Sequence, residues 1–266
     1  MSLSDLITPC NKDHSIKEAV ITLFLANPII KPARFKKLIE NEFKDKFQQF
    51  QALSNIEIQV QNRPNSTANF SQQVLNDAGF KFLGFSNGGA SKVLQALNEK
   101  QRNFISFHYL QYSRWANFYE DFIETIKVIS NQHPDLFVTA VSLHYIDQFF
   151  WKGQLPIDLK QVFKEGGDYL PKEFFKSQIS NYTIVTNKLI DEKKYFNRLE
   201  ITIQENIVPG ITISHNISQT YSDVVDLGEL LTMPEFGTTL EQEHVHNKAI
   251  LKDILQPTII EAIKLN

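Results

Sequence analysis

The residues whose types and spacing could do chemistry occur in two similar segments, Ile105–Leu110 (ISFHYL) and Val141–Ile146 (VSLHYI). Both segments are rich in β-branched and aromatic residues and should be strands, on which side chains alternate between faces. Each strand then carries a serine and a histidine on one face; the four candidate residues are Ser106, His108, Ser142 and His144. Serine beside histidine is the nucleophile–base pair of many hydrolases, although the sequence shows no third group to orient the histidine. A half-buried sheet face packed against the second half of the chain explains the same pattern, and we favour that interpretation.

A second candidate cluster lies late in the chain, where acidic residues and histidines are mixed. At helical spacing Glu241 and His244 share one face, while Glu243 and His246 share another. Glu241, His244 and His246 are therefore candidate metal ligands, but the His-Glu-x-x-His pattern of zinc enzymes is absent. The solvated first turn of a helix explains the same residues, so we expect neither a metal nor another cofactor.

Arg114 and Trp115 form a third candidate site at the start of a helix. This pair could bind a phosphate at the helix N-terminus or stack on a base. Tyr109 and Tyr145, each directly after one of the candidate histidines, complete the candidate binding residues. A core position for Trp115 and a surface position for Arg114 also explain the pair, and we favour this second explanation.

These residues depend on a small set of elements. The apolar residues that follow Trp115 recur at helical spacing, and Pro134 ends the helix before a strand over Phe137–Trp151. The nearly continuous apolar run Glu18–Leu25 predicts a central strand. In a ferredoxin-like arrangement this strand lies between the two Ser-His strands, with the Trp115 helix connecting them.

Other local signals complete the predicted elements. Asn87-Gly88-Gly89 predicts a tight hairpin turn, and the polar run Asn62–Gln73 predicts a mobile loop. We expect a last helix capped by Thr238 or Thr239, with Val245, Ala249, Ile254 and Leu255 as its apolar stripe. The fold class is therefore α+β, with largely antiparallel sheets and helices on one face. The first half is ferredoxin-like with extra strands, and the second half is helix–three strands–helix.

We expect three parts along the chain: an N-terminal tail over residues 1–15, an α+β ferredoxin-like half over residues 16–152, and a second α+β half over residues 153–266 packed on the first. The chain has 266 residues, of which 42% are hydrophobic and 21% charged, which is typical of a folded protein. The apolar run Ala19–Ala26 is too short to cross a membrane, and Cys10 is the single cysteine. These features predict a cytoplasmic protein with no membrane partner.

The net charge of −3 disfavours nucleic acid as the main partner, because phosphate-binding proteins usually carry a basic excess. The lysines over Lys31–Lys46 keep nucleic-acid binding open as an alternative. Interleaved acidic residues make a solvated helix face the preferred explanation of that segment.

Several short motifs resemble a sporadically distributed family of uncharacterised bacterial proteins. They are Glu18-Ala19-Val20, Arg114-Trp115-x-x-Phe118, Leu143–Asp147, Leu240–His246, Leu251–Leu255 and Pro257-Thr258. The resemblance covers most of the chain and supplies no catalytic residues. The patchy distribution of this family implies a mobile or defence-associated context.

We therefore expect a binding or interaction protein and not an enzyme. It would present a sheet face or the Asn62–Gln73 loop to a protein partner encoded nearby, as a component of a toxin–antitoxin or phage-defence system. A homodimer is also compatible with the sequence. The alternatives are a hydrolase or nuclease that uses the Ser/His patch or the Glu/His helix, and a nucleic-acid-binding protein.

Overall fold

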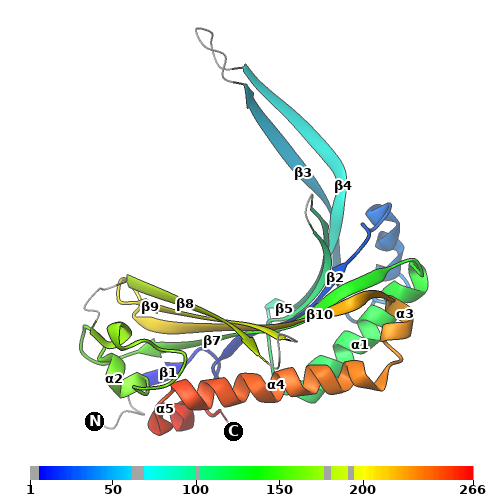
Figure 1. The fold of residues 1–266 in the computed structure, drawn as a ribbon. Coiled ribbons are helices and arrows are strands. Elements are labelled where there is room, and N and C mark those ends of the chain that lie inside the picture. The colour runs from blue at the N-terminus through cyan, green and yellow to red at the C-terminus, as the bar shows by residue number, and fades with distance from the viewer. Residues whose placement is uncertain (1–5, 62–68, 100–101, 177–180, 191–194, 266) are drawn as a thin grey trace.

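The computed structural model describes residues 6–61, 69–99, 102–176, 181–190 and 195–265. The described chain forms one ten-stranded sheet in which neighbouring strands are antiparallel (Figure 1). The strands are β1 (Ile7–Pro9), β2 (Ile16–Leu25), β3 (Gln49–Gln61), β4 (Asn69–Ser86), β5 (Gly89–Asn98), β6 (Asn103–Tyr109), β7 (Phe137–Trp151), β8 (Asn181–Ile190), β9 (Tyr195–Gln204) and β10 (Gly210–Asp226). The helices are α1 (Trp115–Gln132), α2 (Leu159–Val162), α3 (Leu227–Leu230), α4 (Pro234–Ile254) and α5 (Pro257–Ala262), with 3-10 turns η2 (Pro32–Ile39) and η3 (Lys172–Lys176).

The first half has the predicted ferredoxin-like core. Its sheet order is β7-β2-β6-β5, so β2 lies between the two Ser-His strands and α1 connects them. The β3–β4 hairpin is inserted between η2 and β5 and supplies the extra strands. The segment after Pro32 forms a 3-10 helix, although we expected an α-helix there.

The second half continues the same sheet. β7 pairs with β2 along one edge and with β10 along the other, and β9 and β8 follow β10. The expected boundary near residue 152 therefore falls directly after a strand that both halves share. Part of the expected N-terminal tail also joins the sheet, because β1 pairs with β7, with Ile7 opposite Trp151.

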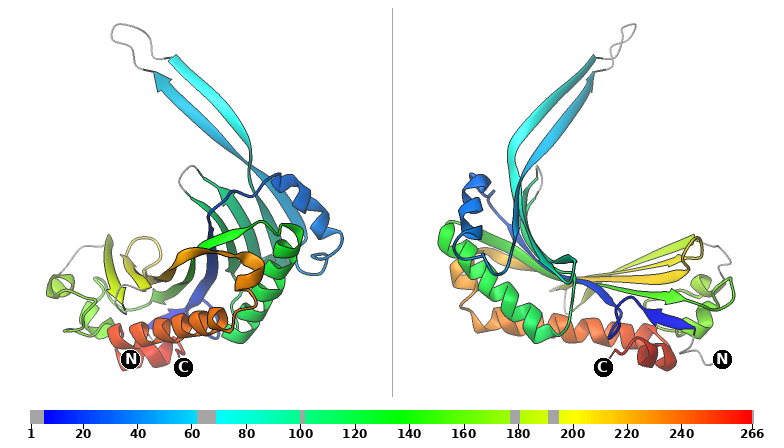
Figure 2. Two further views of the ribbon diagram at one scale, coloured as in Figure 1. Left: turned by 45° about the vertical axis from the view of Figure 1, so that its right-hand side comes forward. Right: turned by 180° about the vertical axis from the view of Figure 1, so that it is seen from behind.

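Alternation along the strands buries one face of the sheet. On β7 the side chains of Val141, Leu143 and Tyr145 are buried beneath α1 and α4. The amphipathic α1 buries the stripe that the sequence predicted, including Phe118, Phe122, Ile126 and Ile129. The helices lie on this face of the sheet, as expected for this fold class (Figures 1 and 2).

The opposite face, which we call the open face, is the inner side of a strongly curved sheet (Figure 2). No described helix covers it, and the second half lies beside the Ser/His strands instead of over them. This arrangement differs from our expectation that the second half packs against that face. The cause is the shared strand β7, which joins the two halves edge to edge.

The outer part of the β3–β4 hairpin leaves the sheet as a two-stranded arm (Figure 1). β5 pairs with β4 only over Gly79–Ser86, whereas β3 and β4 remain paired out to Gln61 and Asn69. The predicted loop Asn62–Gln73 is therefore wrong for residues 69–73, which belong to β4; residues 62–68 lie outside the described residues. At the other end of β4 the predicted turn is present, with positive φ angles of 50° at Asn87 and 80° at Gly88.

Candidate functional site

The open face carries a chain of three hydrogen-bonded side chains at its centre. His108 Nδ1 lies 2.6 Å from Glu18 Oε1, and His108 Nε2 lies 2.8 Å from Ser106 Oγ. The hydrogen bond from His108 lowers the pKa of Glu18, so the carboxylate is the acceptor. In the neutral imidazole Nδ1 then carries the proton, and the Ser106 hydroxyl donates to Nε2. Glu18 is thus the third, orienting group that sequence reasoning missed.

The second Ser-His pair does not form as the sequence suggested. His144 Nε2 contacts Ser214 Oγ of β10 at 2.7 Å, while Ser142 lies on the same face opposite Thr22 and Ser218. Burial lowers the pKa of His144, which favours its neutral form. Both histidines nevertheless line one open hollow of about 320 Å³. Its lining residues are Glu18, Val20, Thr22, Gln95, Phe104, Ser106, His108, His144 and Ile146.

The order Glu18–His108–Ser106 matches the acid–base–nucleophile order of a hydrolase. An oxyanion hole also requires unused N–H groups near the serine. Ser106 lies in a strand that pairs on both sides, opposite Thr22 in β2 and Gln95 in β5, so its neighbouring N–H groups are committed to the ladder. Its exposed fraction is only 3%. The arrangement therefore lacks two features that acyl transfer requires, an accessible serine and free N–H groups beside it.

On the helix side of the sheet, residues from two separate candidate groups meet. The rings of Trp115 and His244 stack at 4.6 Å with an interplanar angle of 5°, and Trp115 Nε1 donates to Glu241. The hydroxyl of Tyr145 lies 2.8 Å from His244 Nδ1. Burial lowers the pKa of His244 to about 4, so this histidine is neutral. Arg114, at the start of α1, is exposed at the edge of the cluster.

Tyr109 lies away from that cluster. Its ring packs 5.5 Å from Phe118, and Lys92 Nζ lies 5.8 Å from the ring centroid. This position between β6 and α1 explains Tyr109 as a packing residue.

A cavity of about 300 Å³ lies next to the Trp115–His244 stack. Asp147 forms part of its wall with an exposed fraction of 1%, and its Oδ1 accepts a 2.6 Å hydrogen bond from Ser15. Burial raises the pKa of Asp147 to about 6. Tyr112, also in the wall, has its pKa raised to about 12 by burial.

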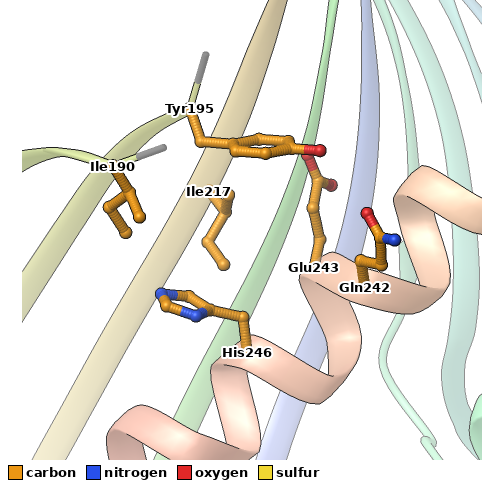
Figure 3. A pocket seen from close by; sticks show the side chains of 6 residues that line it. All are labelled: Ile190, Tyr195, Ile217, Gln242, Glu243 and His246. Carbon is orange, nitrogen blue, oxygen red and sulfur yellow. The ribbon is translucent and has the colours of Figure 1, made fainter. Parts of the chain in front are cut away.

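A third hollow, of about 200 Å³, lies on the other side of α4 (Figure 3). Glu243 and His246 point into it from the helix, as their spacing predicted, with Ile190, Tyr195 and Ile217 opposite. Within the described residues neither carboxyl oxygen of Glu243 has a hydrogen-bond partner, and burial raises its pKa to about 9. The side chain is therefore a neutral acid in a mostly apolar hollow.

The Glu/His helix does not gather its candidate ligands at one point. Glu241 and His244 face Trp115, whereas His246 faces the Glu243 hollow. Over the described ranges, no group of three or more His, Cys, Asp or Glu side chains is arranged to hold a metal ion.

A buried polar network links α4 to the sheet. His215 Nε2 lies 2.6 Å from Asn197 Oδ1, and its Nδ1 lies 2.8 Å from Asn247 Nδ2. Burial lowers the pKa of His215 to about 3. Sequence reasoning left His215 without a role, although its alternation with Ile211, Ile213 and Ile217 is the signal for a buried position.

The fold and these sites define an α+β protein with a ferredoxin-like core and an extended antiparallel sheet. Comparison with protein-family models and with curated proteins gave no match for this chain. None of the described helices is both long and apolar enough to cross a membrane.

Proposed function

We propose that this protein is a cytoplasmic binding protein that holds an extended segment of a protein partner on its open face. The observation that carries this proposal is the uncovered inner side of a curved, ten-stranded sheet (Figures 1 and 2). A sheet surface of this extent, left uncovered by the protein's own helices, is a natural place for a partner.

The chemistry of the open face favours a protein over a nucleic acid. β6, β7 and β10 contain no lysine or arginine, and Arg198 of β9, which register places on the same face, is paired with Glu200 at 3.0 Å. A phosphate backbone requires free cations. Register instead places three exposed apolar side chains on the β8–β9 side of this face: Val185, Leu189 and Phe196, with exposed fractions of 42%, 60% and 42%. A protein partner that covers these side chains would remove their apolar surface from water, which favours association.

The polar centre is already ordered for recognition. Glu18 fixes His108, and Ser214 fixes His144, so these side chains lose little further freedom when a partner binds. The resemblance to an uncharacterised family, whose patchy distribution is similar to that of mobile or defence-associated genes, adds the proposal that the partner is encoded nearby.

The test is capture of a partner from the native host by the purified protein and by matched variants. Ser218→Arg places a bulky charge in the centre of the open face, and Leu189→Asp removes apolar surface at its margin. Both should abolish capture. The arginine side chain would block the face sterically, and the aspartate carboxylate would lose its hydration against the bound segment. Lys127→Glu, on the exposed side of α1, should retain it. A partner captured equally by all four proteins binds elsewhere and would refute the assignment.

A hydrolase is the second candidate, because Glu18, His108 and Ser106 are hydrogen-bonded in the required order. A fluorophosphonate probe that labels the wild type and Ser142→Ala but not Ser106→Ala would establish it. Absence of labelling in wild type and both variants would remove it.

A further inference from the structure

The cavity beside Trp115 and His244 lies on the opposite side of the sheet from the open face and has two unsatisfied buried acceptors. Asp147 Oδ2 is one of them: no described residue donates a hydrogen bond to it, and the side chain is almost completely buried. Burying a carboxylate oxygen without a donor is unfavourable. The site therefore lacks a hydrogen-bond donor.

His14 supplies the second acceptor. Its Nε2 lies 2.6 Å from the carbonyl oxygen of Tyr112, which can only accept, so Nε2 carries the proton. In the neutral ring Nδ1 is then an acceptor, and this buried atom has no partner within the described chain. Asp147 and His14 both line the cavity, so a ligand that fits must bring several N–H or O–H donors.

The rim of the cavity has the opposite polarity. Arg114, Lys248 and Lys264 belong to its wall. Lys264 lies 3.9 Å from the carboxylate of Asp13, which is also in the wall, whereas Arg114 makes no ion pair with any described residue. A ligand with only a cationic group would be repelled at this rim. A ligand that also carries an anionic group would be attracted by the guanidinium, which binds carboxylates in a planar, two-pronged geometry.

We propose that this cavity binds a small zwitterion of the amino-acid class, with its ammonium group at Asp147 and His14 and its carboxylate at Arg114. The volume of about 300 Å³ lies at the lower end of the range for ligand pockets, which suits a molecule of this size. A divalent metal fits less well, because the His, Asp and Glu side chains of the described chain do not gather here, or elsewhere in it, in a group of three or more that could hold one. The proposal does not depend on the partner of the open face.

Trp115 provides a built-in reporter. It lies in the cavity wall, and the protein's other tryptophan, Trp151, belongs to the separate core cluster beneath β9 and β10. In the Trp151→Phe variant, a fluorescence change on ligand addition reports on this cavity alone.

The experiment is calorimetric titration of the full chain with a panel of free amino acids, paired with their deaminated and decarboxylated analogues. We expect at least one amino acid to bind, with at least about tenfold weaker binding of both analogues, a difference of about 1.4 kcal/mol. The same amino acid should change the fluorescence of Trp115 in Trp151→Phe. Asp147→Asn keeps the side-chain size and should weaken binding by at least about tenfold, since it removes the charge.

Arg114→Gln gives a test that does not depend on a buried substitution, because Arg114 is exposed. It should weaken binding of the amino acid but not of the decarboxylated amine, whereas Lys127→Gln should change neither. Binding of the deaminated acid as tight as that of the amino acid would overturn the proposal. The proposal would also be overturned if none of the amino acids bound, and the cavity would then be a site for water alone.

Discussion

At the scale of single residues, the buried ionisable groups dominate the chemistry of this protein. Glu243, Asp147, His215 and His244 all have exposed fractions of 7% or less. Burial favours the neutral form in each case, which raises the pKa of the acids and lowers that of the histidines. Such groups make stability depend on pH in a direction that follows from each shift.

Glu243→Met should stabilise the protein at neutral pH. In the wild type, folding must take up a proton at Glu243, whose pKa rises from 4.5 in the unfolded chain to about 9. Removing this requirement should raise the free energy of unfolding by roughly 3 kcal/mol near pH 7, as measured by urea denaturation. Lys252→Met, on the exposed side of the same helix, should change it by less than about 0.5 kcal/mol. A destabilised Glu243→Met would mean that the carboxyl group makes a favourable contact.

The melting temperature of the wild type should peak near about pH 6. From about pH 9 downward stability increases, because folded Glu243 binds a proton that the unfolded chain does not. Below about pH 6.5 stability falls, because burial lowers the pKa of five histidines in the folded state and the unfolded chain takes up protons that the folded chain does not. These histidines are His133, His144, His215, His244 and His246. Glu243 and Asp147, whose pKa values burial raises, offset only part of this loss. Calorimetric scans across pH would show the peak, and Glu243→Met should lose the alkaline slope while keeping the acidic one.

At the scale of elements, sequence patterns predicted most strands and α1 because alternation and helical spacing are local properties. They failed for α4, which begins at Pro234, before the expected cap. Its buried face includes Glu243, His244 and Asn247. Of the expected stripe, Ile254 and Leu255 are buried, whereas Val245 is 57% exposed. Hydropathy places polar residues outside, so only part of the buried face is predicted for a helix that buries polar groups in a network. The contact among Arg114, Trp115, Tyr145 and His244 could not be predicted either, because it depends on packing between elements that are far apart in the sequence.

The arm depends on one glycine. Gly79 has a φ of +150°, and a Cβ atom there would lie 1.9 Å from the carbonyl oxygen of Ala96 in β5. It stands where β4 leaves the sheet, opposite a register shift between Leu53 and Asn55. Gly79→Ala should therefore destabilise the protein by about 2 kcal/mol or more in urea denaturation.

Gly88→Ala is the matched control. Gly88 also has a positive φ, +80°, but nothing lies within 4 Å of an added Cβ. It should cost only about 1 kcal/mol, the backbone penalty alone. Equal effects of the two substitutions would show that β4 can shift away from β5 without loss.

At the scale of the whole molecule, two core clusters share one sheet and one helix. Phe236 and Leu240 of α4 belong to the first cluster, whereas Ile250, Leu251 and Ile254 belong to the second. β10, in the second half, takes one of its two neighbours, β7, from the first half. The two halves suggested by the sequence therefore do not pack as two independent units.

We expect the chain to unfold in one cooperative transition, because α4 and β7 connect both clusters. A fragment of residues 153–266 should lack a cooperative thermal transition, since it loses β7, β1 and the first cluster. Calorimetry of the whole chain and circular dichroism of the fragment provide the measurements. Two separate transitions in the whole chain, or a fragment that melts cooperatively, would contradict this expectation.

The arm also sets a length scale for the partner that we propose for the open face. Seven paired residues of β3, Asn55–Gln61, extend past the register shift at Leu53, and at about 3.3 Å per residue they reach roughly 23 Å. The arm rises on the side of the open face (Figures 1 and 2). A flat sheet contacts only the nearest layer of a bound molecule, whereas in this protein the arm adds a second surface beside the open face. If an extended segment binds the open face, as we propose, the protein that carries this segment would also meet the side of the arm.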